Sequence, residues 1–181
     1  FGIGSGLFFS YMPFIKVNGL PVSSFRPWPG AIFNRVTKRL GIPIERFKFK
    51  DPDKAMQAMD QFLDKGVPTG CLVGVYHLTY FPKAYRFHFN AHNLVVIGRE
   101  NEEYLISDPI MEEVERLSYD DLKRVRFAKG TYPPKGRMYI MSEVSEDYDL
   151  SKAIIKGIKQ TSKDMLHIPV PLFGVKGIRY M

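Results

Sequence analysis

Residues 91–109 constrain the fold of this chain more than any other part of its sequence. Two short apolar runs, residues 94–97 and 104–106, flank the polar segment 98–102. Apolar runs of this length around a polar segment that contains glycine and asparagine are typical of an antiparallel β-hairpin. We therefore predict two paired strands joined by a tight turn in the middle of the chain.

The predicted hairpin carries a histidine and an aspartate that are equally far from its centre. His92 and Asp108 lie symmetrically about Glu100. In a hairpin centred on Glu100 they would be directly opposite each other, with Cβ atoms ~5 Å apart. A carboxylate beside an imidazole fixes its tautomer and stabilises the imidazolium, as in a nucleophile–His–Asp system. The alternative is a loop histidine followed by an ordinary Asp-Pro turn, and spacing alone leaves both open.

The size and composition indicate a soluble globular protein. The chain has 181 residues, of which 45% are hydrophobic and 25% charged, enough for one core and an appendage. No apolar run approaches the ~20 residues of a membrane helix, so we expect no membrane association. The single cysteine, Cys71, excludes an intrachain disulfide and a cysteine-rich metal site and favours a cytoplasmic location.

The chain is basic, with a net charge of +7 and a pI near 9.4. The excess charge forms no Lys/Arg block. It indicates either a solvated basic surface or attraction to an acidic partner such as a carrier protein, a nucleic acid or a membrane surface. The interleaved aromatic and basic residues of RNA-binding proteins are missing, so we expect no nucleic-acid partner.

The N-terminus opens on the run Gly2-Ile3-Gly4-Ser5-Gly6. Its spacing does not fit the Gly-x-Gly-x-x-Gly dinucleotide fingerprint, and no strand precedes it. A close backbone passage beside a core or an active site is the better interpretation, which makes Gly4 and Ser5 candidates for lining a substrate site. Because the sequence lacks an initiator Met and ends abruptly, we expect it to begin inside a larger domain.

Periodicity and capping residues predict alternating helices and strands along the chain. The expected helices cover residues 31–40, a segment capped by Asp51 and Pro52, a segment capped by Ser118, and residues 151–165. The expected strands and extended segments are 14–17, 20–25, 43–50, 67–75, 111–116 and 138–144.

Between residues 76 and 90 lies a long loop rich in aromatic residues and histidines. Long loops within a compact domain are often functional, although this one could equally fold onto its own core. Its aromatic and histidine members are Tyr76, His77, Tyr80, Phe81, Tyr85, Phe87, His88 and Phe89.

Several motifs along the chain resemble one known family. They are Lys-Gly-Val-Pro at 65–68, Tyr-His-Leu-Thr-Tyr at 76–80, His-Phe-Asn-Ala-His at 88–92 and Ser-Asp-Pro at 107–109. Together they resemble the N-terminal domain of the butirosin biosynthesis protein H family, which has a papain-like fold with a cysteine nucleophile.

The resemblance implies an α+β fold with a central antiparallel sheet flanked by helices. Residues 1–128 would form the papain-like domain without its N-terminal nucleophile helix. Residues 129–181 would form a linker and the start of the helical region that follows in this family.

The resemblance also implies acyl transfer through a thioester in bacterial secondary metabolism. The acyl group would pass from an acidic acyl carrier protein to a small-molecule amine, with no cofactor and no metal. His92 would be the general base and Asp108 its orienting residue, while the nucleophilic cysteine would precede Phe1. We take Tyr76, Tyr80 and His88 as candidates for lining the substrate site.

Some features leave alternatives open. Gly74 stands where the resemblance leads us to expect an acidic residue. Cys71 could be the nucleophile, although a mid-strand thiol lacks a helix N-terminus to lower its pKa. His88, His92 and Asp108 could form a two-His-one-carboxylate metal site. A peptidase or amidase of the same fold and a non-catalytic binding domain remain rival functions.

Overall fold

The computed structural model describes residues 1–17, 19–88, 90–130, 132–141 and 147–180. The chain divides into two compact units. We call Ile44–Ser142 the sheet unit and Phe1–Pro43 together with Glu143–Met181 the hairpin unit. Each unit is described by itself.

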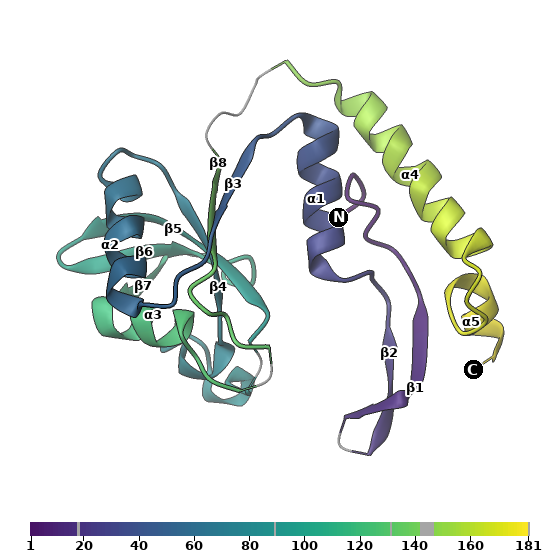
Figure 1. The fold of residues 1–181 in the computed structure, drawn as a ribbon, viewed down its shortest axis with the longest axis horizontal. Coiled ribbons are helices and arrows are strands. Elements are labelled where there is room, and N and C mark those ends of the chain that lie inside the picture. The colour runs from purple at the N-terminus through teal and green to yellow at the C-terminus, as the bar shows by residue number, and fades with distance from the viewer. Residues whose placement is uncertain (18, 89, 131, 142–146, 181) are drawn as a thin grey trace. The chain divides into compact units, whose positions relative to one another are not determined.

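The sheet unit is built on a six-stranded sheet in the order β3-β8-β4-β5-β6-β7, in which all neighbouring strands are antiparallel (Figure 1). The predicted α+β class with a central antiparallel sheet is therefore confirmed. The strands are β3 (Ile44–Phe47), β4 (Thr69–Val73), β5 (His92–Glu100), β6 (Glu103–Ser107), β7 (Glu115–Ser118) and β8 (Met138–Met141).

Two helices of the sheet unit begin at the predicted capping residues. In α2 (Pro52–Leu63) the Asp51 side chain accepts hydrogen bonds from the second and third backbone N–H groups, and Pro52 occupies the first turn. In α3 (Tyr119–Arg126) the Ser118 hydroxyl accepts from the N–H of Asp121. Both caps satisfy donors that a helix leaves free at its start, so the local sequence decides where these helices begin.

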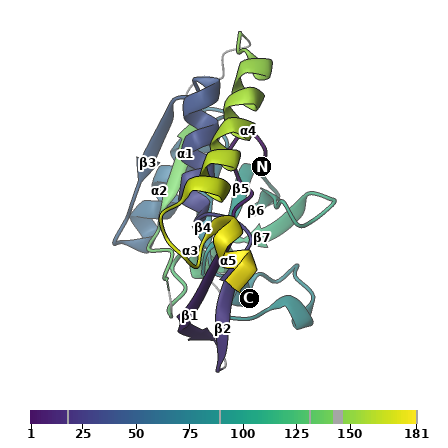
Figure 2. The ribbon, with the colours of Figure 1, turned by 90° about the vertical axis from the view of Figure 1, so that its right-hand side faces the viewer.

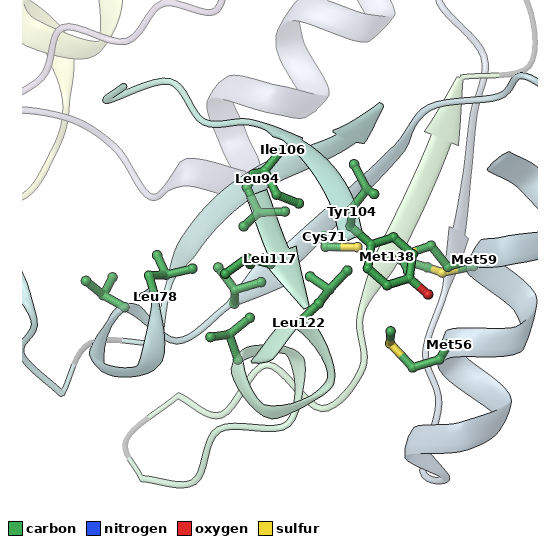
Figure 3. Close-up of a cluster of buried hydrophobic side chains, with 14 of the residues drawn as sticks. Met56, Met59, Cys71, Leu78, Leu94, Tyr104, Ile106, Leu117, Leu122 and Met138 are labelled. Atoms are coloured by element: carbon green, nitrogen blue, oxygen red, sulfur yellow. The ribbon is translucent and has the colours of Figure 1, made fainter. Parts of the chain in front are cut away.

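The core of the sheet unit lies between α2, α3 and one face of the sheet (Figure 3). Cys71 lies within it, fully buried on β4, as its place in the middle of a strand predicted. The side chains labelled in Figure 3 come from both helices and from five of the strands, as well as from the loop that follows β4: Met56, Met59, Cys71, Leu78, Leu94, Tyr104, Ile106, Leu117, Leu122 and Met138.

A buried arginine is part of the same core. Arg126, at the end of α3, is 0% exposed and donates a hydrogen bond to the Ala55 carbonyl oxygen. Its guanidinium also contacts the sulfur atoms of three methionines, and its Nε finds no acceptor among the described residues. The contacted methionines are Met56, Met59 and Met138.

In the described residues, the hairpin unit combines a β-hairpin with three helices. Strands β1 (Ser10–Val17) and β2 (Leu20–Ser24) pair antiparallel, as predicted, while Asn18 of the predicted turn lies outside the described residues. Helix α4 (Leu150–His167) runs beside α1 (Pro29–Leu40), as both views show (Figures 1 and 2). The short α5 (Gly174–Tyr180) packs against β1.

The glycine-rich N-terminus packs inside the hairpin unit. A Cβ atom on Gly4 would lie 2.6 Å from the Ile32 side chain, and one on Gly157 would lie 2.4 Å from the Gly2 carbonyl oxygen. The Ser5 hydroxyl donates a 2.9 Å hydrogen bond to the Gly157 carbonyl oxygen. The glycines therefore permit a close approach between the N-terminal run and the two helices.

Several strand boundaries differ from the sequence-based expectation. Strand β1 begins at Ser10 instead of 14, and β7 spans Glu115–Ser118 instead of 111–116, so β7 runs directly into α3. The sheet unit extends to Ser142 because β8 lies between β3 and β4 in the sheet. Among the described residues, no helix has both the length and the apolar content to cross a membrane.

Candidate functional site

The β5–β6 hairpin exists as predicted, but its turn lies further along the chain. Asn101 and Glu102 form the turn, with φ angles of 50° and 65°. Two successive residues with positive φ are the geometry of the two-residue turns that suit a twisted hairpin. The predicted centre at Glu100 is wrong, because Glu100 is already paired with Glu103.

A β-bulge at Ile97 resets the pairing between the turn and the site. On the turn side Gly98 pairs with Leu105, whereas on the far side Val96 pairs with Ile106, so Ile97 is an extra residue. A shift of one residue exchanges the two faces of a strand. The bulge therefore changes which residues of β5 share a face with the end of β6.

The bulge brings His92 and Asp108 onto one face. Beyond it, Val95 pairs with Ser107, so Asp108 follows across from Leu94, whose side chain shares the face of His92. If Ile97 were paired with Ile106 instead of bulged, Asp108 would lie across from Val95, on the opposite face. The two site residues are therefore diagonal neighbours. The prediction that they lie directly opposite each other is wrong.

The His92 and Asp108 side chains nevertheless meet. His92 Nε2 lies 2.7 Å from Asp108 Oδ2. The carboxylate also accepts a 2.8 Å hydrogen bond from the Tyr80 hydroxyl and a 3.0 Å hydrogen bond from the Ile110 backbone N–H. The Asp108 side chain is fully buried, and that of His92 is 10% exposed.

The electrostatics of Asp108 favour the ionised carboxylate. Burial alone raises the pKa of Asp108, but the hydrogen bonds from His92, Ile110 and Tyr80 outweigh it, so the pKa lies below its ordinary value. Burial, and then the hydrogen bond to Asp108, raise the pKa of Tyr80 well above that of a free tyrosine. Tyr80 is therefore a protonated donor at neutral pH.

An ionised Asp108 determines which nitrogen of His92 carries the proton. A carboxylate can only accept hydrogen bonds, so Nε2 must be the protonated nitrogen. In the neutral imidazole Nδ1 then carries the lone pair, which can accept a proton. The Phe81 ring packs edge-on against the imidazole, with centroids 5.6 Å apart, and limits its rotation. This arrangement has the geometry that a general base held by an orienting carboxylate requires.

The structure adds a role for Tyr80 that the sequence did not reveal. Its place in the lining of the substrate site stays a prediction; in the structure the Tyr80 hydroxyl, on the aromatic loop, donates a hydrogen bond to Asp108. The Ile110 N–H contact was also missed. Its signal was present in the sequence, because an aspartate before proline commonly accepts from the N–H two residues on.

The other candidates in the aromatic loop lie in a separate group. His88 stacks on Tyr76 with ring centroids 4.0 Å apart, and Tyr76 meets His77 edge-on. Among the described residues, no three His, Cys, Asp or Glu side chains are placed to hold a metal ion. His88 therefore does not join His92 and Asp108 in a metal site.

The other candidate positions, at Cys71, at Gly4 and Ser5, and at Gly74, are closely packed against neighbouring residues. Burial raises the pKa of the Cys71 thiol, which keeps it protonated and unreactive within the core. Gly4 and Ser5 lie in the hairpin unit, against α1 and α4. At Gly74 a Cβ atom would lie 2.5 Å from both Ala128 Cβ and Asn90 Oδ1. This close packing leaves no room for the acidic side chain that the resemblance led us to expect.

Comparison with known proteins yields two family matches and a distant structural likeness. The model of the family described as butirosin biosynthesis protein H, N-terminal, matches residues 1–109. A model described as a domain of unknown function, DUF4872, matches residues 120–181. No protein with a curated description matches the chain.

Among solved structures, a C39-like peptidase from Bacillus anthracis is 12% identical to this chain, with a TM-score of 0.43. The likeness covers 68% of this chain and 64% of the peptidase chain.

Proposed function

Because the chain belongs to the family of the butirosin biosynthesis protein H N-terminal domain, we propose that it supplies the His–Asp half of a cysteine-dependent acyltransferase. The single observation that carries the proposal is the buried contact between His92 and Asp108, with Tyr80 holding the carboxylate. A histidine so oriented suits the activation of a thiol.

In the proposed reaction the nucleophile is a cysteine outside these 181 residues. Its thiol gives a proton to His92 Nδ1, and the thiolate attacks the carbonyl carbon of an acyl thioester. The tetrahedral intermediate collapses, and the donor thiol leaves with the proton from His92. An amine then attacks the acyl-enzyme, gives its proton to His92, and the cysteine thiol is restored.

The basic character of the chain supports an acidic acyl carrier protein as the donor. A net charge of +7 favours encounter with an anionic partner and raises the association rate at low salt. The acceptor would be a small-molecule amine. These substrate classes come from the family and are part of the proposal.

The test is covalent labelling of the protein that carries this chain. The protein is incubated with a radiolabelled acyl thioester of N-acetylcysteamine and quenched in acid. We expect an acyl-enzyme in the wild type and in Cys71→Ala, and ~100-fold slower labelling in His92→Ala, which is the low end of the effect of a general base.

The matched control is His88→Ala, which removes a loop histidine four positions away that stacks on Tyr76. We expect this variant to be labelled at the wild-type rate. Labelling that does not depend on His92, or that is lost in Cys71→Ala, would refute the proposed assignment.

The fate of the label separates the rival functions. Release to an added amine faster than to water supports acyl transfer, whereas release to water alone identifies an amidase or peptidase. No acyl-enzyme with any thioester, amide or peptide substrate identifies a non-catalytic binding domain.

A further inference from the structure

The sheet unit carries two neighbouring hollows that the proposed acyl transfer does not use. Their volumes are about 410 and 460 Å³, within the range of small-molecule sites. Both are lined by Tyr76, His77 and Arg124. We call the two together the Tyr76 pocket.

The lining of the Tyr76 pocket is basic. Among the described residues that line it are three lysines and two arginines but no aspartate or glutamate. Lys123 is paired with Asp53, and Arg124 lies 3.5 Å from Asp121, but both carboxylates lie outside the lining. The cations of the lining are Lys83, Arg86, Lys123, Arg124 and Lys129.

The electrostatics at His77 agree with an excess of positive charge. Burial lowers the pKa of His77, and the positive charge of Arg124 lowers it further, while Asp121 acts in the opposite direction. A cation that outweighs a nearby carboxylate in this way favours an anion beside it.

The lining of the Tyr76 pocket also includes the stacked aromatic rings of Tyr76 and His88. The His88 and Tyr76 rings are stacked at an interplanar angle of 11°, and Tyr76 is 43% exposed. Phe127 and Ala128 add apolar surface to the same hollow. An exposed, flat ring pair beside Arg and Lys side chains is the combination that binds planar rings attached to phosphates.

We infer that the Tyr76 pocket binds a phosphorylated ligand that carries a planar ring, of the nucleoside diphosphate class. The ring packs against Tyr76 and His88, and the phosphates lie among Arg124, Lys123 and Lys129. The inference stands on residues of the sheet unit alone and does not depend on acyl transfer.

The test compares three probes by calorimetric titration of the full chain: ADP, pyrophosphate and adenosine. We expect ADP to bind ~10-fold more tightly than pyrophosphate, because stacking of a ring adds about that factor. Adenosine alone should bind more weakly than either. Raising the salt concentration should weaken ADP binding, since exposed charges are screened.

Two substitutions separate the contributions of charge and ring. Arg124→Gln should weaken ADP and pyrophosphate binding by about tenfold each, as expected for the loss of a charged hydrogen bond. Tyr76→Ala should reduce the affinity for ADP to that for pyrophosphate. Lys65→Gln is the matched control, since it removes one exposed cation from the same unit outside the pocket.

Circular dichroism shows whether each variant is folded. If Arg124→Gln does not fold, Lys129→Gln, which also removes a cation from the pocket lining, replaces it in the ADP and pyrophosphate titrations. Equal affinities for ADP and pyrophosphate, or equal effects of Arg124→Gln and Lys65→Gln, overturn the inference. So does the absence of ADP binding at millimolar concentration.

Discussion

Replacing Tyr80 with phenylalanine tests how the buried carboxylate is held. The substitution removes the hydroxyl that donates to Asp108 over 2.8 Å and leaves the ring in place. A hydrogen bond to a charged group contributes ~1.5–3 kcal/mol, and we take about 2 kcal/mol for this one because the Asp108 side chain is fully buried. Losing it should raise the pKa of Asp108, because one of the hydrogen bonds that hold this pKa below its ordinary value is removed.

The pH dependence of this loss follows from the sign of the shift. The folded-state pKa of Asp108 lies below its unfolded value. Its contribution to stability is therefore fully present above the unfolded pKa, near 3.9, and is lost as the pH falls through the folded pKa. Tyr80→Phe should be less stable than the wild type by about 2 kcal/mol at pH 7, and the difference should shrink below about pH 4.

The assay is urea unfolding of the full chain at neutral and acidic pH, with NMR titration of the Asp108 carboxyl carbon. Tyr104→Phe is the matched control, because its hydroxyl donates over 2.8 Å to Asp60, a carboxylate that remains partly exposed and is shared with Arg99. That change should cost less than about 1 kcal/mol. Equal losses in the two variants at pH 7, or a loss in Tyr80→Phe that does not change with pH, would refute the reasoning.

Three further predictions concern the bulge, a glycine and the buried arginine. Deleting Ile97 should remove the bulge but leave Val96 paired with Ile106, and Asp108 across from Leu94, so the hydrogen-bonded imidazole proton signal should persist in the NMR spectrum; loss of that signal in a folded variant contradicts the register argument. Gly74→Ala should lower the free energy of unfolding by ~1–3 kcal/mol through overpacking, measured by urea unfolding, whereas Gly98→Ala, whose Cβ would meet its nearest neighbour at 3.8 Å, should not. Arg126→Met should unfold at an equal or higher urea concentration, because the buried guanidinium pairs with no carboxylate among the described residues, and a clear loss of stability would show that its contacts outweigh its desolvation.

The sequence was sufficient for the elements whose signals are local. The caps at Asp51 and Ser118 satisfy donors within the next turn of the same helix, so neighbouring residues decide them. The β5–β6 hairpin was equally readable from its two apolar runs. The register of that hairpin was not, because a bulge depends on how β5 packs against both of its neighbours, and no residue type marks it.

For the candidate site, too, some features follow from the local sequence and others only from the tertiary structure. The sequence by itself determined that a histidine and an aspartate stand at the open end of one hairpin, since both follow from their spacing around a turn. Only the tertiary structure decided that they share a face, through the bulge at Ile97, and that hydrogen bonds, including the one from Tyr80, keep the buried carboxylate ionised. The physical reason is that hairpin formation depends on contacts close in sequence. The face that a side chain occupies and the pKa of a buried group depend on neighbours that only folding brings together.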